Sequence, residues 1–153
     1  MNIKLTIELV PKTAWFTHLR SELSTSQWNL IRRTTYRKSN YRCEICNGVG
    51  PRWPVECHEI WHYDDNNYIQ KLVGTIALCP DCHMVKHIGF AQIRGLLSNA
   101  IVHLQKTNKW NLSTAESYIK SAFNVWNKRS NHIWKMDTVW LKENFDIDLD
   151  IRG

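Results

Sequence analysis

The chain has 153 residues, of which 43% are hydrophobic and 22% are charged, and its formal net charge at pH 7 is +6. This length suits one domain spanning residues 1–153 with a modest core. No stretch approaches the ~20 consecutive apolar residues of a membrane span, and the charged start over residues 1–8 is unlike a signal peptide. We therefore expect a cytoplasmic protein with no membrane partner.

The N-terminal quarter predicts one strand and two helices. Apolar and polar residues alternate over residues 2–10 until Pro11, which is typical of a strand. A short helix is expected over 13–23 and a longer one over 25–38. Ser24 is among the N-cap candidates for the longer helix.

The middle of the chain predicts a hairpin followed by a helix. Residues 55–63 predict a strand, and residues 69–78 predict a return segment after an Asp- and Asn-rich turn. Pro80 suits the first turn of a helix over 80–88, and Gly89 is placed to end it. The expected unit is strand, turn, strand and helix.

The C-terminal part predicts helices over residues 91–107 and 114–128 and a short one near 137–143. The sequence contains no internal repeat and no linker. We therefore expect an α+β fold in one domain, with a metal-stapled core over about residues 40–90, the N-terminal strand, and a helical extension over about residues 91–145.

Two Cys-x-x-Cys pairs are the strongest motifs, Cys43 with Cys46 and Cys79 with Cys82. Each two-residue loop lets both sulfurs turn toward one ion, so four thiolates at these spacings are typical of a closed tetrahedral zinc site. Paired cysteines in the cytosol bind metal more often than they form disulfides. We therefore predict a structural Zn²⁺ on these four residues, whereas Cys57 is expected to belong to the core.

Histidines near the second cysteine pair are candidates for another metal site. His83 and His87 lie four residues apart on the predicted helix, so both imidazoles face the same way. His58, on the strand expected over residues 55–63, would complete a three-histidine site. Strand alternation puts Glu59 on the opposite face from His58 unless a bulge or twist intervenes. His62 shares the face of His58 if the strand is regular, and is otherwise a solvent-facing residue.

Positive charge is concentrated before and around the first cysteine pair, interleaved with aromatic residues. The cations of this basic block include Arg52 and the five residues expected to bind nucleic acid, namely Arg32, Arg33, Arg37, Lys38 and Arg42. Such a block is the electrostatic footprint of a nucleic-acid binder, with a solvated helix face as the alternative. We favour nucleic acid, with DNA as the expected partner. For Trp53 and Trp61, which flank the predicted site, we do not favour stacking on bases.

Residues 40–90 resemble the HNH (ββα-metal) nucleases, in which cysteine pairs flank a histidine-bearing strand and Cys-x-x-Cys-His-x-x-x-His follows. More narrowly, residues 56–61 (ECHEIW), 76–83 (IALCPDCH) and 86–89 (KHIG) are similar to a group of bacterial and phage HNH endonucleases. The resemblance implies a hairpin and helix around a catalytic divalent metal such as Mg²⁺ or Mn²⁺. It also implies cleavage of DNA phosphodiester bonds.

The resemblance leaves the general base open between two alignments. Matching the family's His-His-Ile to residues 58–60 makes His58 a metal ligand and puts Glu59 at the position of the base. Matching Asp-His instead makes His58 the base and puts Cys57 where a carboxylate ligand stands. The expected ligands of the catalytic metal are His58, His83 and His87, and the catalytic candidates are His58 and Glu59.

Three functions follow from these patterns. The first is a metal-dependent HNH-type endonuclease or nickase that hydrolyses DNA phosphodiester bonds. The second is a catalytically silent, zinc-stabilised nucleic-acid-binding or protein-interaction module on the same fold, motivated by the irregular pair His58 and Glu59. The third is a phage or mobile-element factor with a host protein as partner, motivated by the acidic C-terminal residues and the extra helices.

Overall fold

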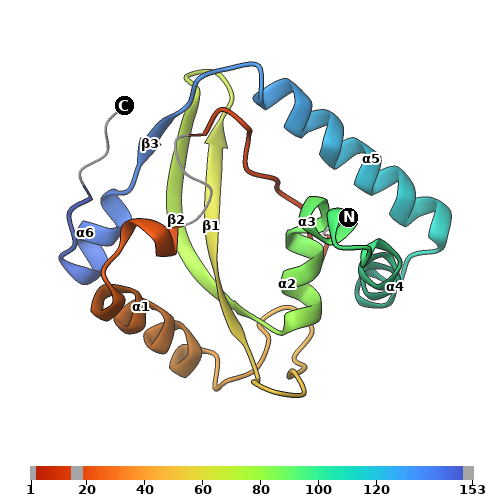
Figure 1. Ribbon diagram of the computed structural model, residues 1–153, viewed down its shortest axis with the longest axis horizontal. Helices are drawn as coiled ribbons and strands as arrows, with labels where there is room; N and C mark the ends of the chain where they lie inside the picture. The colour runs from red at the N-terminus through yellow and green to blue at the C-terminus, as the bar shows by residue number, and fades with distance from the viewer. Residues whose placement is uncertain (1–2, 15–18, 150–153) are drawn as a thin grey trace.

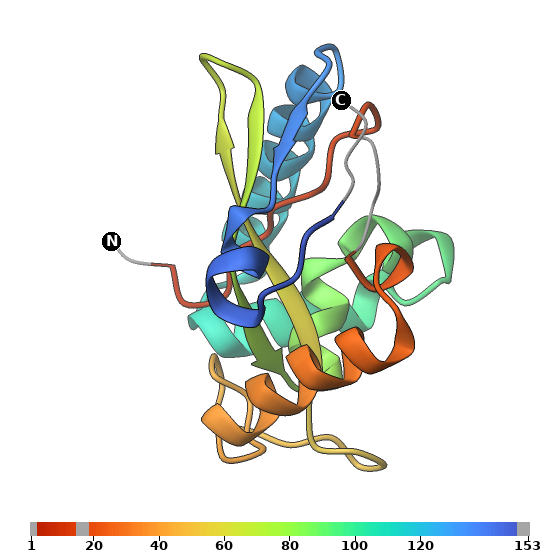
Figure 2. The same ribbon diagram turned by 90° about the vertical axis from the view of Figure 1, so that its left-hand side faces the viewer.

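The computed structural model describes residues 3–14 and 19–149 and has an α+β fold. Its elements in chain order are η1 (Leu19–Glu22), α1 (Thr25–Lys38), β1 (Glu56–Asp64), β2 (Ile69–Leu78), α2 (Pro80–Lys86), α3 (Ile88–Ile93), α4 (Leu97–Asn108), α5 (Leu112–Arg129), β3 (Lys135–Asp137) and α6 (Val139–Phe145). A narrow sheet runs through the middle of the molecule, with α1 and α6 on one side and α2 to α5 on the other (Figure 1). Figure 2 views the sheet from the side of α1 and α6.

The sheet has the order β1-β2-β3. β1 and β2 form the predicted antiparallel hairpin, and β3 joins β2 in parallel. The register shifts between Ile60, which pairs with Gly74, and Trp61, which pairs with Leu72, so the hairpin carries a bulge at this point. β1 lies at the edge of the sheet, and its histidine-bearing first half precedes the bulge.

Two apolar clusters flank the sheet. The first lies among α2, α4 and α5 and contains Leu78, Val85 and Leu104 together with three of the paired cysteines. The second lies beneath α1 and α6 and contains Ile31, Leu72 and other buried side chains, including the predicted core residue Cys57. Full burial of one Leu or Ile contributes roughly 1.5–3 kcal/mol, so both clusters stabilise the sheet.

α1 follows the sequence prediction for residues 25–38. Ser24 is its N-cap, and the Ser24 hydroxyl accepts a hydrogen bond from the Gln27 backbone N–H at 3.1 Å. The Gln27 side chain in turn accepts from the Ser24 backbone N–H at 3.0 Å, which completes a capping box. A strictly local pattern therefore sets the start of this helix.

The predicted N-terminal strand over residues 2–10 is wrong for its described part, residues 3–10, which form no strand. The side chain of Asn108 accepts from the Leu5 N–H at 2.8 Å and donates to the Leu5 carbonyl at 2.9 Å, and the Tyr118 hydroxyl accepts from the Ile7 N–H at 3.0 Å. Leu5 and Ile7 are buried, as the alternation indicates. Their backbone partners are side chains of α4 and α5, so the segment never joins the sheet.

Two of the predicted helices are interrupted. The helix expected over 80–88 ends at Lys86, because His87 adopts φ −105° and ψ 46° between α2 and α3. The helix expected over 91–107 is divided between α3 and α4 at Gly95, whose φ of +74° is the left-handed conformation that glycine adopts readily. These breaks let α3 and α4 turn back over α2.

The remaining helix predictions are met in part. α5 confirms the helix expected over 114–128 but begins at Leu112, with Asn111 as its N-cap. α6 confirms the short helix near 137–143. Of the helix expected over 13–23, the described residues contain only η1, and residues 15–18 lie outside the described part. Among the described helices, none has the length and apolar character needed to cross a membrane.

Candidate metal centres

The four paired cysteines form one cluster at the base of the hairpin. The sulfurs of Cys43, Cys46, Cys79 and Cys82 all lie within 4.8 Å of one another, and Cys46 Sγ is 3.6 Å from Cys79 Sγ. A zinc tetrahedron with Zn–S bonds of about 2.3 Å has S–S edges of roughly 3.8 Å. All five cysteines of the chain are free thiols. The cluster is therefore compatible with a zinc site.

Local turns and a pair of hydrogen bonds between Glu44 and Ala77 bring the two cysteine pairs together. Cys79 is the N-cap of α2, and its sulfur accepts from the Cys82 backbone N–H at 3.4 Å. The Glu44 carboxylate accepts from the Ala77 N–H at 2.7 Å, and the Glu44 N–H donates to the Ala77 carbonyl at 2.9 Å. Glu44 thereby fastens the first pair to the end of β2, directly before the second pair.

The cluster is also prepared electrostatically for a cation. A hydrogen bond with the Cys82 thiol lowers the pKa of Cys43, which favours a thiolate in the cluster. His103 on α4 lies with Nε2 3.1 Å from Cys82 Sγ, a contact that the sequence did not indicate. It links the cysteine cluster to the helical extension.

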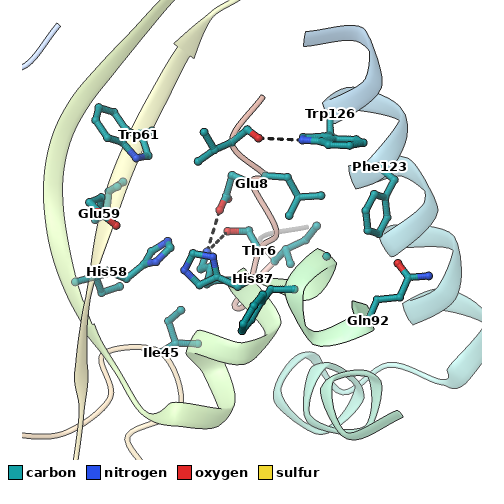
Figure 3. Close-up of a pocket in the computed structure, with 18 of the residues that line it drawn as sticks. Thr6, Glu8, Ile45, His58, Glu59, Trp61, His87, Gln92, Phe123 and Trp126 are labelled. Atoms are coloured by element: carbon teal, nitrogen blue, oxygen red, sulfur yellow. Dashed lines mark hydrogen bonds and ion pairs between the residues drawn. The ribbon is translucent and has the colours of Figure 1, made fainter. Parts of the chain in front are cut away.

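Three histidines converge on the other side of α2, as the sequence predicts. Ring nitrogens of His58 on β1, His83 on α2 and His87 at the end of α2 lie within 4.8 Å of one another. His83 Nε2 is 3.1 Å from His87 Nε2. Two nitrogens on one ion, each about 2.1 Å from it, are separated by roughly 3.0–3.4 Å. Figure 3 shows the rings of His58 and His87 turned toward each other.

Glu56 orients one of these histidines. His83 Nδ1 lies 3.0 Å from Glu56 Oε1, so Nδ1–H donates to the carboxylate and Nε2 is left for the histidine cluster. No role for Glu56 was predicted from the sequence. The available signal was strand alternation, because Glu56 stands two residues before His58 on the same face of β1.

His58 is held neutral. Burial lowers its pKa to about 2, with further lowering by the neighbouring His87 and His83. Its Nδ1 is buried and has no hydrogen-bond partner among the described residues. An orphaned imidazole nitrogen beside two more imidazoles fits a metal ligand, so the donor set suits a divalent cation.

Glu59 lies apart from the histidines, on the face of β1 that packs against α1 and η1. The backbone N–H of Leu19 donates to Glu59 Oε1 at 2.5 Å, and the neighbouring Cys57 thiol donates to Thr35 Oγ1 at 3.7 Å. The bulge follows Glu59 and therefore does not turn it toward His58. His62 lies beyond the bulge and is exposed.

The histidine cluster lies between two hollows. The first, of about 960 Å³, is bounded by β1, α3, α5 and the N-terminal segment (Figure 3). Its lining is mainly apolar and includes Phe123 and Trp126 on α5. The buried Lys86 ammonium also lies there and donates to Thr6 Oγ1 at 2.8 Å and Glu8 Oε2 at 3.0 Å. This ion pair fastens the N-terminal segment to α2.

The second hollow, of about 770 Å³, lies on the α1 side of the histidines. His83 and His87 line it together with two arginines, Arg20 on η1 and Arg32 on α1. Four aromatic residues also line it, namely Trp28, Tyr36, Tyr41 and Trp53. Glu59 is shared by the linings of both hollows.

The basic residues predicted to bind nucleic acid are not gathered at this centre. Among the described residues that line the second hollow, Arg32 is the sole member of that set, whereas Arg20 was not singled out from the sequence. The other four members are exposed on α1 and on the loop after it, namely Arg33, Arg37, Lys38 and Arg42. The structure thus separates one arginine, which shares a hollow with His83 and His87, from a wider basic surface.

The chain matches no protein-family model, no curated protein and no solved structure. The likeness to HNH nucleases is therefore one of motifs.

Proposed function

We propose that this protein is a metal-dependent endonuclease or nickase of the HNH type that hydrolyses DNA phosphodiester bonds. One observation carries the proposal: imidazoles from a hairpin strand and from the following helix converge beside a four-cysteine cluster. The order β1, β2, α2 is also the order that the resemblance implies. Among the described residues, the cysteine and histidine clusters are the two groups of three or more His, Cys, Asp or Glu side chains that could hold a metal ion.

Two metals are part of the proposal. Zn²⁺ on the cysteine cluster would hold the hairpin and α2 in place. A divalent metal on His58, His83 and His87 would stabilise negative charge on the scissile phosphate and on its leaving oxygen. Because imidazole suits Ni²⁺ and its neighbours better than Mg²⁺, we expect binding to strengthen from Mg²⁺ to Mn²⁺ to Ni²⁺.

The residues of the chain have distinct parts in the reaction. The neutral His58 ring offers a lone pair in a site that excludes much of the solvent. Glu56 keeps His83 Nε2 directed at the histidine cluster through its bond to Nδ1–H. The two candidates for the group that accepts the proton of the attacking water are His58 and Glu59. His58 lies in the histidine cluster, whereas Glu59 lines both hollows but faces α1 and accepts from the Leu19 N–H.

The test is nicking of supercoiled plasmid by zinc-loaded protein with Mg²⁺, Mn²⁺ and Ni²⁺ added separately. We expect the wild type to nick with at least one metal and His58→Ala to lose cleavage, with zinc content and DNA affinity nearly unchanged. His62→Ala is the matched control, because His62 is an exposed histidine on the same strand beyond the bulge. Glu59→Gln in the same assay assigns the base: loss of cleavage with metal binding retained identifies Glu59.

Cleavage by His58→Ala at the wild-type rate would show that the histidine cluster is not the active site. A zinc-loaded, folded wild type that cuts with none of the metals would favour the silent binding module. The engagement of Glu59 by the Leu19 N–H is the observation on the side of that alternative. Binding by the silent module would weaken steeply with salt as phosphate contacts release counterions.

A further inference from the structure

We infer that the second hollow receives unpaired nucleotides of DNA, whose bases stack on Tyr41 and Trp53 while the backbone leads to the histidine cluster. The inference rests on the proposed nuclease function and specifies its substrate class. The substrate is DNA with a single-stranded segment or an extruded base beside the scissile phosphate.

The charges in the second hollow suit a phosphate backbone. Within the described part of the chain, neither Arg20 nor Arg32 forms an ion pair with a carboxylate. The two glutamates in the lining are engaged by the protein itself, Glu56 by His83 and Glu59 by the Leu19 N–H. Arg32 Nε donates to Asn29 Oδ1 at 2.9 Å. Both arginines line a hollow whose carboxylates are already bound, an arrangement that attracts an anionic ligand.

The aromatic residues of the hollow divide into a packed pair and an exposed pair. Trp28 and Tyr36 pack against the second apolar cluster. Tyr41 and Trp53 are 50% and 49% exposed, so each presents a large ring to solvent. This exposure favours a stacking role for Trp53, which the sequence alone did not favour. Exposed rings beside arginines are the two parts from which single-strand binding sites are built.

The backbone holds Tyr41 at the hollow in an unfavourable conformation. Asn40 and Tyr41 both have positive φ, 56° and 59°. For Asn at the end of a helix this is common, whereas for a bulky residue such as Tyr it is an outlier that costs energy. The Tyr41 N–H donates to the Tyr36 carbonyl at 2.9 Å, and the zinc-type turn at Cys43 follows two residues later. Strained residues of this kind are concentrated at ligand sites.

Trp53 is presented on a loop that is fixed against α2. The Gly50 N–H donates to the Pro54 carbonyl at 3.0 Å, which closes the loop around Trp53. A Cβ on Gly50 would lie 2.4 Å from the Trp53 carbonyl oxygen and 2.7 Å from Pro80 Cδ, so the backbone passes too close for any other residue. The ring of Trp53 therefore stands on a rigid support, which lowers the entropy cost of stacking on it.

The choice between the two hollows and between paired and unpaired DNA follows from chemistry. The first hollow has a mainly apolar lining, and its buried ammonium group on Lys86 is already paired with Glu8. In a duplex the faces of the bases are covered by their neighbours, so aromatic rings find a stacking partner only on a base that has left the stack. The second hollow is thus matched to unpaired nucleotides.

The experiment measures DNA binding by zinc-loaded protein without added Mg²⁺, Mn²⁺ or Ni²⁺. Fluorescence anisotropy compares a labelled single strand of about 12 nucleotides with the duplex of the same sequence. We expect the single strand to bind more tightly, and Trp53→Ala and Tyr41→Ala each to weaken that binding by at least about fivefold. Duplex binding should be nearly unchanged in both variants.

Two kinds of control distinguish stacking from a structural role. Phe90→Ala removes another exposed aromatic ring, 59% exposed and located at the first hollow, and should leave single-strand binding unchanged. Trp53→Phe and Tyr41→Phe keep a ring and should restore most of the binding lost in the alanine variants. Retained zinc content in every variant excludes a collapse of the cysteine cluster.

The inference is overturned if the duplex binds as tightly as the single strand, or if Trp53→Ala weakens binding no more than Phe90→Ala. Plasmid nicking that Trp53→Ala leaves unchanged, on fully paired DNA, would also overturn it while the nuclease function stands. Suppose that single-strand binding depends on the rings of Tyr41 and Trp53 but that no added metal supports cleavage. That result would support the site and refute the nuclease function. The two failures are therefore distinguishable.

Discussion

Glu56 decides the direction in which His83 faces. A carboxylate that accepts from one imidazole nitrogen fixes the ring and its tautomer and makes the other nitrogen a better ligand. In this protein the bond joins β1 to α2 at 3.0 Å. Unlike His83, His87 does not lie within a helix. It is the C-cap of α2 at the junction with α3, and its ring reaches the histidine cluster from there.

We predict that Glu56→Ala weakens metal binding at the histidine cluster about 10- to 100-fold. Calorimetric titration of zinc-loaded protein with Mn²⁺ or Ni²⁺ measures this change in affinity. The zinc content of the cysteine cluster should stay the same, since Glu56 contacts none of those sulfurs. Glu22→Ala, at an exposed carboxylate on η1, is the control. Equal metal affinity in Glu56→Ala and the wild type would contradict the orienting role.

The N-terminal segment is an element whose backbone is satisfied without a sheet. A single side-chain amide, that of Asn108, supplies both a donor and an acceptor to Leu5, as a neighbouring strand would. Tyr118 supplies the acceptor for Ile7. Because buried backbone groups must be paired, the extended segment can lie on α4 and α5 and leave the edge of β1 uncovered. That arrangement creates the wall of the first hollow.

We predict that Asn108→Ala lowers the free energy of unfolding by about 1–3 kcal/mol, because it leaves the N–H and carbonyl of Leu5 without partners. Chemical denaturation of zinc-loaded protein measures the change. Asn99→Ala is the matched control, since Asn99 is an exposed asparagine on the same helix, and its stability should stay within about 0.5 kcal/mol of the wild type. Similar stability of the two variants would mean that the segment is held by its apolar contacts alone.

At the scale of the whole molecule, the cysteine cluster is part of the first apolar cluster and not an appendage of it. Cys43, Cys79 and Cys82 are buried among the side chains of α2, α4 and the N-terminal segment. Cys57 belongs instead to the second cluster, beneath α1 and α6, and burial raises the pKa of its thiol to about 12. We therefore expect the four paired cysteines to depend on a metal ion and Cys57 to be independent of it.

We predict that a chelator that removes zinc lowers Tm by more than about 10 °C or abolishes cooperative unfolding, because metal binding to such a site supplies folding free energy. Thermal unfolding followed by circular dichroism measures the change. Elemental analysis should give one zinc per chain in the wild type and in Cys57→Ser, and loss of zinc in Cys46→Ser. Unchanged Tm after complete zinc removal would show that the apolar clusters suffice.

Much of the candidate site was predictable because its signals are short in range. Residues close together in the sequence determine the Ser24 cap of α1, the hairpin and each of the two cysteine pairs. Spacing along α2 correctly indicated that His83 and His87 face the same way. Strand alternation correctly separated His58 from Glu59.

Other features were beyond prediction from the sequence because they depend on which distant segment meets which. Alternation determined that Leu5 and Ile7 are buried, whereas packing decided that their backbone partners are side chains of α4 and α5. The same holds for the contact of Glu56 with His83 and for the hollow that gathers Arg20, Tyr41 and Trp53. The sequence by itself determined local conformation and ligand spacing, since these depend on neighbours in the chain. Only the tertiary structure decided how the edge of β1 is left open and what faces the histidines, because those outcomes depend on competition among partners far apart in sequence.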